Sequence, residues 1–398
     1  MTDVAERLEE LREHGLYRQL RPIEGPQGPS VTLDGQPVLL LCSNNYLGLA
    51  EREEVRAAAA EAAMRWGAGA GASRLISGNM ELHRRLEERL AGFKGYEAAL
   101  LFGSGYLANT GVIAALAGAG EVVFSDELNH ASIVDGCRLS RAETFVYRHA
   151  DLEHLAWALY HQRGRPALIV TDGVFSMDGD VALLAELLEL ARRHGARLMV
   201  DEAHATGAIG PGGRGSVAAA GLNGEVDVVV GTLGKALGSY GSYVCANDET
   251  IELLVNSARP FIFSTAPPPP AVGAALAALD VLEAEPELVE RLQANARRLR
   301  TALAAEGLGV GAANTQVIPV HVGAAEVAME LCEAALQRRI FAQGIRPPTV
   351  PEGSCRLRCT VMATHTAAEM SLAARQIGAA AREIGLAPTS RALSVRVA

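Results

Sequence analysis

Hydrophobic residues in this chain gather in short runs that alternate with longer amphipathic stretches. Five runs rich in Val, Ile and Leu predict buried strands, at Val122–Ser125, Ala167–Thr171, Arg197–Val200, Val226–Val230 and Ser242–Ala246. Helical periodicity separates them, for example at Leu152–Tyr160 and Leu183–His194, where Gly195 follows the second helix. Continuous apolar strands joined by helices are typical of a mostly parallel sheet that is covered on both faces.

The second part of the chain has a different element order, which predicts a smaller α+β domain. A proline run at 266–270 interrupts the pattern. The expected elements after it are a helix at Pro286–Glu306, a strand at Gln316–Val322, a helix at Ala324–Gln343, a strand at Arg356–Val361 and a helix at Thr366–Ile384. The first forty-odd residues suggest a helix and a short strand. We therefore expect an N-terminal segment (1–45), a large domain (46–280), a small C-terminal domain (281–386) and a tail (387–398).

Composition narrows the function classes. The 398 residues carry a formal charge of −10, which argues against a nucleic-acid binder because phosphate neutralisation needs clustered Lys and Arg. The longest apolar run, at 271–279, is too short to span a bilayer, and the charged N-terminus lacks the apolar core of an export signal. The six scattered cysteines are expected to be reduced thiols and not a metal site. These features predict a cytoplasmic enzyme without a membrane or nucleic-acid partner.

Lysine is rare in this chain. Of 36 basic residues only Lys94 and Lys235 are lysines, and the rest are arginines. An ammonium group can lose its proton near neutral pH in a suitable site, whereas a guanidinium cannot. Lys94 lies where an amphipathic helix ends, so a structural role beside the helix dipole explains it. Lys235 lies in the glycine-rich segment 231–235 and has no such explanation, which makes it the candidate reactive amine.

Polar residues follow four of the predicted strands. In sheets of this kind ligands bind beyond the carboxyl ends of the strands, so these residues are expected to share one rim. They are Asp126 and His130, Asp172 and Ser176, Asp201 and His204, and Thr232 and Lys235.

Two interpretations compete for the segment Asp201-Glu202-Ala203-His204. The first is a nucleotide-dependent motor, because this spelling after a strand is that of a helicase Walker B box. That interpretation requires an upstream phosphate loop, but the Gly-Lys pair here lies downstream, at 234–235, and continues with Ala236. The motor interpretation is therefore disfavoured, and ATP turnover would distinguish it from the second.

The second interpretation is binding of pyridoxal phosphate. This cofactor needs a lysine for its aldehyde and a carboxylate opposite its ring nitrogen, here Lys235 and Asp201. His130 is placed to stack on the ring, and His204 to contact the phenolic oxygen. The glycine-rich segment 103–106 would offer backbone N–H groups to the phosphate. Singly, each feature has a structural alternative: Asp201 could cap a helix, the histidines could be structural, and the glycines could serve a turn.

The motifs resemble those of the α-oxoamine synthases, pyridoxal phosphate enzymes that condense an amino acid with an acyl-CoA and release CO2. The resemblance extends from about Leu16 to Leu386. It is carried by Ser43-Asn44-Asn45-Tyr46-Leu47-Gly48-Leu49, by Asn129-His130-Ala131-Ser132, by the run from Thr171 to Asp180, by Val200-Asp201-Glu202-Ala203-His204 and by Thr232-Leu233-Gly234-Lys235. It implies the fold-type I, aspartate-aminotransferase-like α/β architecture, with a mostly parallel seven-stranded sheet in the large domain.

The resemblance also implies roles for individual residues. Lys235 would bind the cofactor covalently, Asp201 would pair with the ring nitrogen and His130 would stack on the ring, with His204 as a further catalytic residue. Ser176 and His204 would contact the phenolic oxygen. The phosphate would be held by Gly105, Tyr106 and Thr232, and by Ser264 and Thr265 reaching from the partner subunit of a homodimer. On sequence grounds alone, local capping explains Ser264 and Thr265 equally well.

Substrate residues are implied in the same way. Arg358 would bind the amino acid's carboxylate, although Arg356 shares its face of the predicted strand and the choice rests on the family position. His130 and Asn44 would contact substrate, with Asn44 and Ser176 orienting the acyl carbonyl. Arg18 and Thr349 would meet the acyl chain.

The segment 345–351 is most similar to the biotin-pathway branch of the family, which joins L-alanine to pimeloyl-CoA or to a pimeloyl-carrier protein. A glycine C-acyltransferase or an enzyme of broader acyl range is the alternative. A scaffold that keeps the fold without catalysis is poorly motivated, because the lysine, both histidines and the aspartate are all present.

Overall fold

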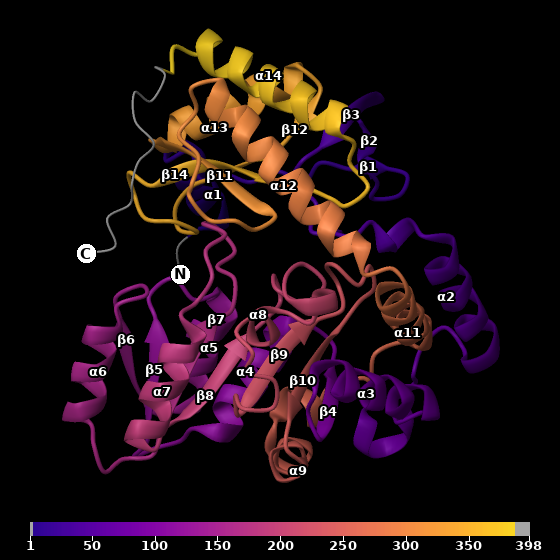
Figure 1. The fold of residues 1–398 in the computed structure, drawn as a ribbon, viewed down its shortest axis with the longest axis vertical. Helices are drawn as coiled ribbons and strands as arrows, with labels where there is room; N and C mark the ends of the chain where they lie inside the picture. The colour runs from indigo at the N-terminus through magenta and orange to yellow at the C-terminus, as the bar shows by residue number, and fades with distance from the viewer. Residues whose placement is uncertain (1–2, 387–398) are drawn as a thin grey trace. The chain divides into compact units, whose positions relative to one another are not determined.

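The computed structural model describes residues 3–386, which form two compact units (Figure 1). Unit 2 comprises Asn44–Gln293, and unit 1 comprises the described residues up to Ser43 and from Ala294 onward. The N-terminal segment thus belongs to the same unit as the C-terminal domain. The second change of unit falls after Gln293, where the sequence suggested 280. The expected tail at 387–398 lies outside the described residues.

Unit 2 is built on the expected mostly parallel sheet, which has seven strands in the order β4-β10-β9-β8-β7-β5-β6. Among these seven described strands, β10 is the one whose direction is opposite to that of the other six. The strands are β4 (Ala98–Phe102), β5 (Val122–Asp126), β6 (Glu143–Tyr147), β7 (Ala167–Asp172), β8 (Arg197–Asp201), β9 (Val228–Thr232) and β10 (Ser242–Ala246). The predicted fold class is therefore confirmed.

Successive residues of the central strands point to opposite faces, and each face is covered by helices (Figure 1). Leu168 and Val170 pack in one core with α4 (Gly105–Leu116), α5 (Ala131–Ser140) and α9 (Asp248–Ser257). Ile169 packs in the other core with α6 (Leu152–His161) and α7 (Leu184–His194). Because both faces are buried, the strands read as uninterrupted apolar runs.

The sequence analysis missed two strands of this sheet. β4 has the sequence Ala-Ala-Leu-Leu-Phe, whose Ala and Leu residues are good helix formers, so propensity conceals the strand. β6 pairs along one side with β5 and stands at the end of the strand order, and four of its five residues are not fully buried. Edge strands of this kind carry a weak hydrophobic signal.

The proline run is a helix start and not a break between domains. α11 (Pro269–Ala284) begins on prolines, which are tolerated in the first turn because their missing N–H groups have no intrahelical partner. Its apolar stretch is buried against α2 (Glu53–Trp66). A Cβ at Gly273 would stand 2.6 Å from the Ala62 side chain, so glycine permits this close approach.

Unit 1 contains two small sheets and four helices among its described residues. One sheet has the order β1-β2-β3-β12, and the other is β11-β14-β13. Their strands are β1 (Ile23–Glu24), β2 (Ser30–Leu33), β3 (Gln36–Leu40), β11 (Val317–Gly323), β12 (Ile340–Phe341), β13 (Gln343–Ile345) and β14 (Cys355–Thr360). The helices are α1 (Val4–Glu13), α12 (Glu287–Ala305), whose first turns belong to unit 2, α13 (Ala325–Gln337) and α14 (Ala367–Glu383). Within residues 3–386 no helix combines the length and apolar character that a bilayer span requires.

Two sequence predictions in unit 1 were wrong. The helix expected at 324–343 ends at Gln337, because Arg339 adopts a left-handed conformation (φ 64°) and the chain then forms β12 and β13. The N-terminal segment contains three strands after its helix and not one. β3 pairs in parallel with β12, a partner about 300 residues away that local pattern could not reveal.

Lys94 has a structural role, as expected, but the reason differs. Its ammonium group is buried and forms an ion pair with Glu202, whose side chain is inaccessible to solvent. Nζ also donates to the carbonyl of Arg214 at 2.5 Å. The second carboxylate oxygen of Glu202 accepts from the hydroxyl of Ser216 (2.8 Å) and the N–H of Val217 (2.7 Å). Buried ion pairs of this kind require such complete hydrogen bonding.

Breaking this pair should destabilise the protein strongly. Glu202→Gln leaves a buried, unpaired ammonium group and is expected to lower the free energy of unfolding by about 3–5 kcal/mol, measured by urea denaturation. The double variant Lys94→Met/Glu202→Gln should recover most of the loss. Arg84→Met, at an exposed pair, is the control and should leave the unfolding midpoint unchanged. Equal stability of Glu202→Gln and the wild type would contradict the ion pair.

Candidate active site

The carboxyl ends of β5, β7, β8 and β9 lie side by side in unit 2 because these four strands are parallel neighbours. Asp126, Asp172, Asp201 and Thr232 are their last residues. The Cα atom of Asp172 is paired in register with that of Asp201. The structure therefore brings together on one rim the polar groups that the sequence placed at strand ends.

Lys235 is held by a chain of hydrogen bonds at this rim. Its Nζ lies 2.7 Å from Nε2 of His204, and Nδ1 of His204 lies 2.6 Å from the hydroxyl of Tyr46. That hydroxyl donates to Oδ1 of Asn44 at 3.1 Å. Since the Tyr46 hydroxyl donates to Asn44, Nδ1 of His204 is the donor to Tyr46. In the neutral form of the ring, Nε2 then accepts from Lys235.

Asp201 is oriented by Asn109, a residue of α4. The Asn109 side-chain amide donates to Oδ2 of Asp201 at 2.6 Å, and Oδ1 of Asp201 accepts the N–H of Ala203 at 2.8 Å. The same amide group donates to the hydroxyl of Ser132 at 2.9 Å, which in turn lies 2.7 Å from Nδ1 of His130. One amide therefore links the carboxylate to the imidazole that caps α5.

Charges along the rim act on one another. Burial raises the pKa of the Asp172 carboxyl well above its ordinary value, and the neighbouring Asp201 charge adds to that effect. The N–H of His130 donates to Asp172 at 3.0 Å, which partly opposes it. Burial lowers the pKa of His130, as does Lys235, while Asp201 acts in the other direction. The lowered pKa favours the neutral form of the His130 imidazole.

The helix α4 offers a place for a phosphate. Ser104 caps it by accepting the N–H of Leu107, which leaves the N–H groups of Gly105 and Tyr106 in the first turn for a ligand. A Cβ at Gly105 would meet nothing within 4 Å, so this end of the helix faces open space. The Tyr106 hydroxyl instead donates to Asp135.

The four other residues predicted to contact the phosphate or the phenolic oxygen are placed as follows. The Thr232 hydroxyl donates to the Gly241 carbonyl at 3.1 Å and accepts from Gly234 N–H, so it braces the lysine loop in this state. Thr265 is exposed and pairs as an isolated β-bridge with Ser73, and Ser264 precedes it. Ser176 lies in the loop after β7. Their contacts with the cofactor stay predictions.

The residues that the sequence predicts to bind substrate, Arg18, Thr349 and Arg358, belong to unit 1. Arg18 and Thr349 line a cavity of about 790 Å³ together with Arg346. Arg358 is buried on β14, and so is Arg356, so accessibility does not separate these two guanidinium groups.

Sequence analysis missed two residues of the site. Tyr46 lies inside a motif that was recognised, but no role was assigned to it. Asn109 is a fully buried amide in a helix whose other buried positions are mostly apolar. A polar side chain on the buried face of a helix is the signal that could have indicated a partner.

These residues fit pyridoxal phosphate. The rim supplies a lysine amine for the aldehyde and a buried carboxylate, fixed by two donors, for the ring nitrogen. It also supplies an exposed imidazole for the ring face and a helix N-terminus that faces open space for the phosphate. A helicase would instead need a phosphate loop ahead of Asp201, and the segment before β8 is the helix α7.

Comparison with known proteins agrees with this arrangement. Residues 36–377 match the family model described as aminotransferase class I and II. The chain is 53% identical to an 8-amino-7-oxononanoate synthase from Citrifermentans bemidjiense over 94% of this chain and 97% of that protein. It is 54% identical to an 8-amino-7-oxononanoate synthase from Geobacter sulfurreducens, over 93% and 95% of the two chains.

Solved structures are similar over most of the chain. A serine palmitoyltransferase from S. paucimobilis with bound PLP has a TM-score of 0.92 at 35% identity, over 96% of this chain and 98% of that chain. An 8-amino-7-oxononanoate synthase from Francisella tularensis has a TM-score of 0.76 at 28% identity, over 87% and 99%.

Removal of the Asn109 amide should weaken cofactor binding. Asn109→Ala leaves Asp201 without its side-chain donor, so the carboxylate can rotate from the ring nitrogen, and the dissociation constant of pyridoxal phosphate should rise about tenfold. Titration of the visible absorption band measures this constant. Asn256→Ala, which removes an exposed amide on α9, is the control. An unchanged constant in Asn109→Ala would show that Asp201 is held without Asn109.

Proposed function

The chain belongs to the aminotransferase class I and II family, and on that premise we propose that it condenses L-alanine with a pimeloyl thioester. Pyridoxal phosphate is the cofactor, and 8-amino-7-oxononanoate, CoA and CO2 are the products, in biotin biosynthesis. The observation that carries the proposal is 53% identity over 94% of the chain to a protein of that activity. The cytoplasmic location and a carrier-protein donor in place of CoA stay predictions.

The relatives at more than 50% identity favour this activity over a related one. The 8-amino-7-oxononanoate synthases from C. bemidjiense and G. sulfurreducens are 53% and 54% identical to this chain, whereas the serine palmitoyltransferase shares the fold at 35% identity and the synthase from F. tularensis at 28%. Glycine C-acyltransferase activity, the alternative from the sequence, has no specific observation in its favour.

Lys235 is the base of the proposed reaction. When bound, pyridoxal phosphate supplies an electron sink for negative charge on the α-carbon of the amino acid. Nζ of Lys235 takes the α-proton, and Nε2 of His204, at 2.7 Å, holds that nitrogen in place. Tyr46 fixes the His204 tautomer so that Nε2 stays an acceptor. Asp201, oriented by Asn109, holds a proton on the ring nitrogen.

Unit 1 provides the groups proposed to bind substrate. Arg358 pairs with the amino acid's carboxylate in a bidentate geometry that suits a guanidinium. The 790 Å³ cavity is lined by apolar residues such as Leu40, Ile345 and Phe341 and by the cations Arg18 and Arg346. Apolar walls with cationic groups suit an acyl chain that ends in a carboxylate, which is the chemistry of a pimeloyl group.

We further propose a homodimer with a shared site. Large apolar side chains are exposed on unit 2 near the segment that carries Ser264 and Thr265. Phe263 is 70% exposed and Ile76 is 80% exposed, and a β-bridge joins their two segments through Ser73 and Thr265. Contiguous exposed apolar side chains are typical of a protein interface. Ser264 and Thr265 would then serve the phosphate of the partner subunit.

Substrate choice tests the proposed function. CoA release should be fastest with L-alanine and pimeloyl-CoA, and at least about tenfold slower with glycine or with acetyl- or succinyl-CoA, since lost pocket contacts cost that much. Lys235→Ala should show neither CoA release nor the visible band of the bound cofactor. Faster release with glycine and acetyl-CoA would support a glycine C-acyltransferase instead.

Mixing two inactive variants tests the shared site. Ser264→Ala/Thr265→Ala is expected to lose phosphate contacts in one chain, and Lys235→Ala loses the amine in the other. A mixed dimer restores one complete site, so refolding the two together should recover about a quarter of wild-type activity if chains pair at random. Each variant refolded alone is the control. No recovery in the mixture would mean that each subunit holds its own phosphate contacts.

A further inference from the structure

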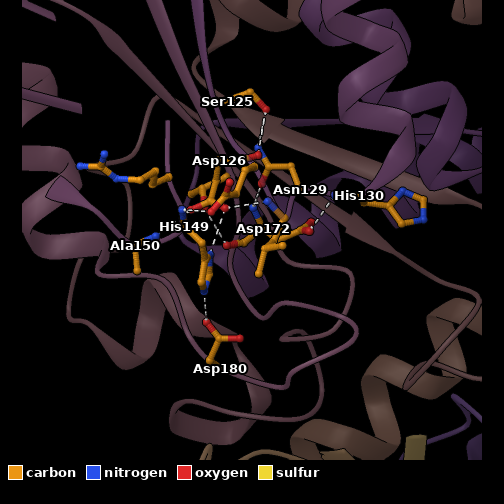
Figure 2. A network of polar contacts seen from close by, with 12 residues as sticks. Ser125, Asp126, Asn129, His130, His149, Ala150, Asp172 and Asp180 are labelled. Atoms are coloured by element: carbon orange, nitrogen blue, oxygen red, sulfur yellow. Dashed lines mark hydrogen bonds and ion pairs between the residues drawn. The ribbon is translucent and has the colours of Figure 1, made fainter. Parts of the chain in front are cut away.

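His149 is a histidine that the reaction described above does not use. It follows β6 and lies between two carboxylates of different segments, as Figure 2 shows. Nδ1 lies 3.0 Å from Oδ1 of Asp126, the last residue of β5, and Nε2 lies 2.8 Å from Oδ2 of Asp180. Asp126 is buried at 3% exposure of its side chain, and His149 is 23% exposed.

The two contacts determine the protonation of the ring. A neutral imidazole has one N–H and one lone pair, so it would set a lone pair against one of the carboxylates. Only the imidazolium donates to both Asp126 and Asp180, and charge-assisted hydrogen bonds are the stronger kind. His149 is therefore a cation that satisfies a buried carboxylate on one side and a loop carboxylate on the other.

The loop that His149 holds is the one that carries Ser176. The loop closes on itself through Phe175 N–H to the Asp180 carbonyl (3.0 Å) and Gly179 N–H to the Phe175 carbonyl (2.8 Å). The Phe175 ring packs edge-on against His149, with centroids 4.4 Å apart and planes at 82°. Phe175, which precedes Ser176 in the sequence, and Asp180, which follows it, thus both contact the imidazole of His149.

On the other side of His149, the contacts of Asp126 extend through the turn after β5 to His130. Asp126 accepts the N–H groups of Leu128 (2.9 Å) and Ala150 (3.1 Å), which fixes the turn after β5. In that turn the Asn129 amide donates to the Ser125 hydroxyl (2.9 Å) and its oxygen accepts the N–H of Asp172 (2.9 Å), as Figure 2 shows. His130, the next residue, donates to Asp172.

We propose that His149 is a positioning residue that clamps the Ser176 loop to the end of β5, and so sets Ser176 relative to His130 for the cofactor. The proposal rests on the proposed function, because Ser176 and His130 are cofactor contacts only there. In this proposal His149 acts through Asp180, Phe175 and Asp126, and not through a contact of its own with cofactor or substrate.

The charge on His149 gives the clamp a pH dependence. Burial opposes that charge, but hydrogen bonds to Asp126 and Asp180 outweigh it and raise the pKa of His149 to about 10. Glu127 accepts its backbone N–H, and Asp172 faces Asp126 from β7. Because the folded pKa exceeds the unfolded value of about 6.5, the stabilisation is complete below about pH 6.5 and is lost as pH rises through about 10.

Three measurements on the full-length protein test the clamp, with and without added pyridoxal phosphate. In His149→Gln, hydrogen exchange of the amides at 173–182 should become about tenfold faster, because a charge-assisted contact is lost. The visible band should shift as it does in Ser176→Ala, and the double variant should show no further shift. The difference in free energy of unfolding between wild type and His149→Gln should become smaller as the pH rises from 6.5 to 10. His161→Gln, at an exposed histidine on α6, should change none of these.

Unchanged loop exchange or an unshifted band in His149→Gln would overturn the clamp. Should that variant fail to fold, Asp180→Asn removes only the loop carboxylate's charge, and the same two measurements decide. A wild-type protein without any pyridoxal phosphate band would contradict the proposed function. A normal wild-type band with unchanged variants would contradict the clamp alone.

Discussion

Three carboxylates at the ends of adjacent parallel strands are the constraint around which unit 2 is organised. Asp126, Asp172 and Asp201 are each at most 5% exposed, and parallel pairing sets them next to one another. Burying neighbouring negative charges costs free energy unless each is hydrogen-bonded, paired with a cation or protonated. The three carboxylates are stabilised in different ways. Asp126 pairs with the His149 imidazolium, and Asp201 accepts from the Asn109 amide. Asp172 has a raised pKa and accepts the backbone N–H of His130.

Because each carboxylate has its own partners, Asp201 does not share a cation with Asp126 or Asp172 and can serve as the proposed partner of the cofactor. If all three carboxylates shared one cation, that cation would also neutralise Asp201, the group proposed to face the cofactor ring. Lys94, the other lysine of the chain, is instead bound to Glu202, one residue further along. The two acidic neighbours thus have different partners: Glu202 forms an ion pair with Lys94, and Asp201 accepts from the Asn109 amide and from the N–H of Ala203.

Much of this arrangement could be predicted from the sequence, because it depends on local pattern. Buried parallel strands read as apolar runs, and the polar residues that follow them must meet at one rim, so Asp201, His204 and Lys235 were found together. The features that the sequence did not reveal depended on distant partners or lay at a partly exposed edge. β12 is two residues long and exists because β3 lies beside it, and β6 is an edge strand with a weak pattern. Asn109 and His149 were missed because only the fold shows the carboxylates that they bind.

The reversed direction of β10 has a consequence for the reactive amine. Parallel neighbours need a long crossover, usually with a helix, whereas antiparallel neighbours can be joined by a short connection. Residues 233–241 form such a connection between Thr232 and Ser242, which are paired in register, and Leu233 is bonded to both Ser239 and Gly241. Lys235 therefore lies on a hairpin that is anchored at both ends in the sheet. An inserted or deleted residue in this hairpin would displace the Lys235 nitrogen. The length of the turn is therefore as constrained as the identity of the lysine.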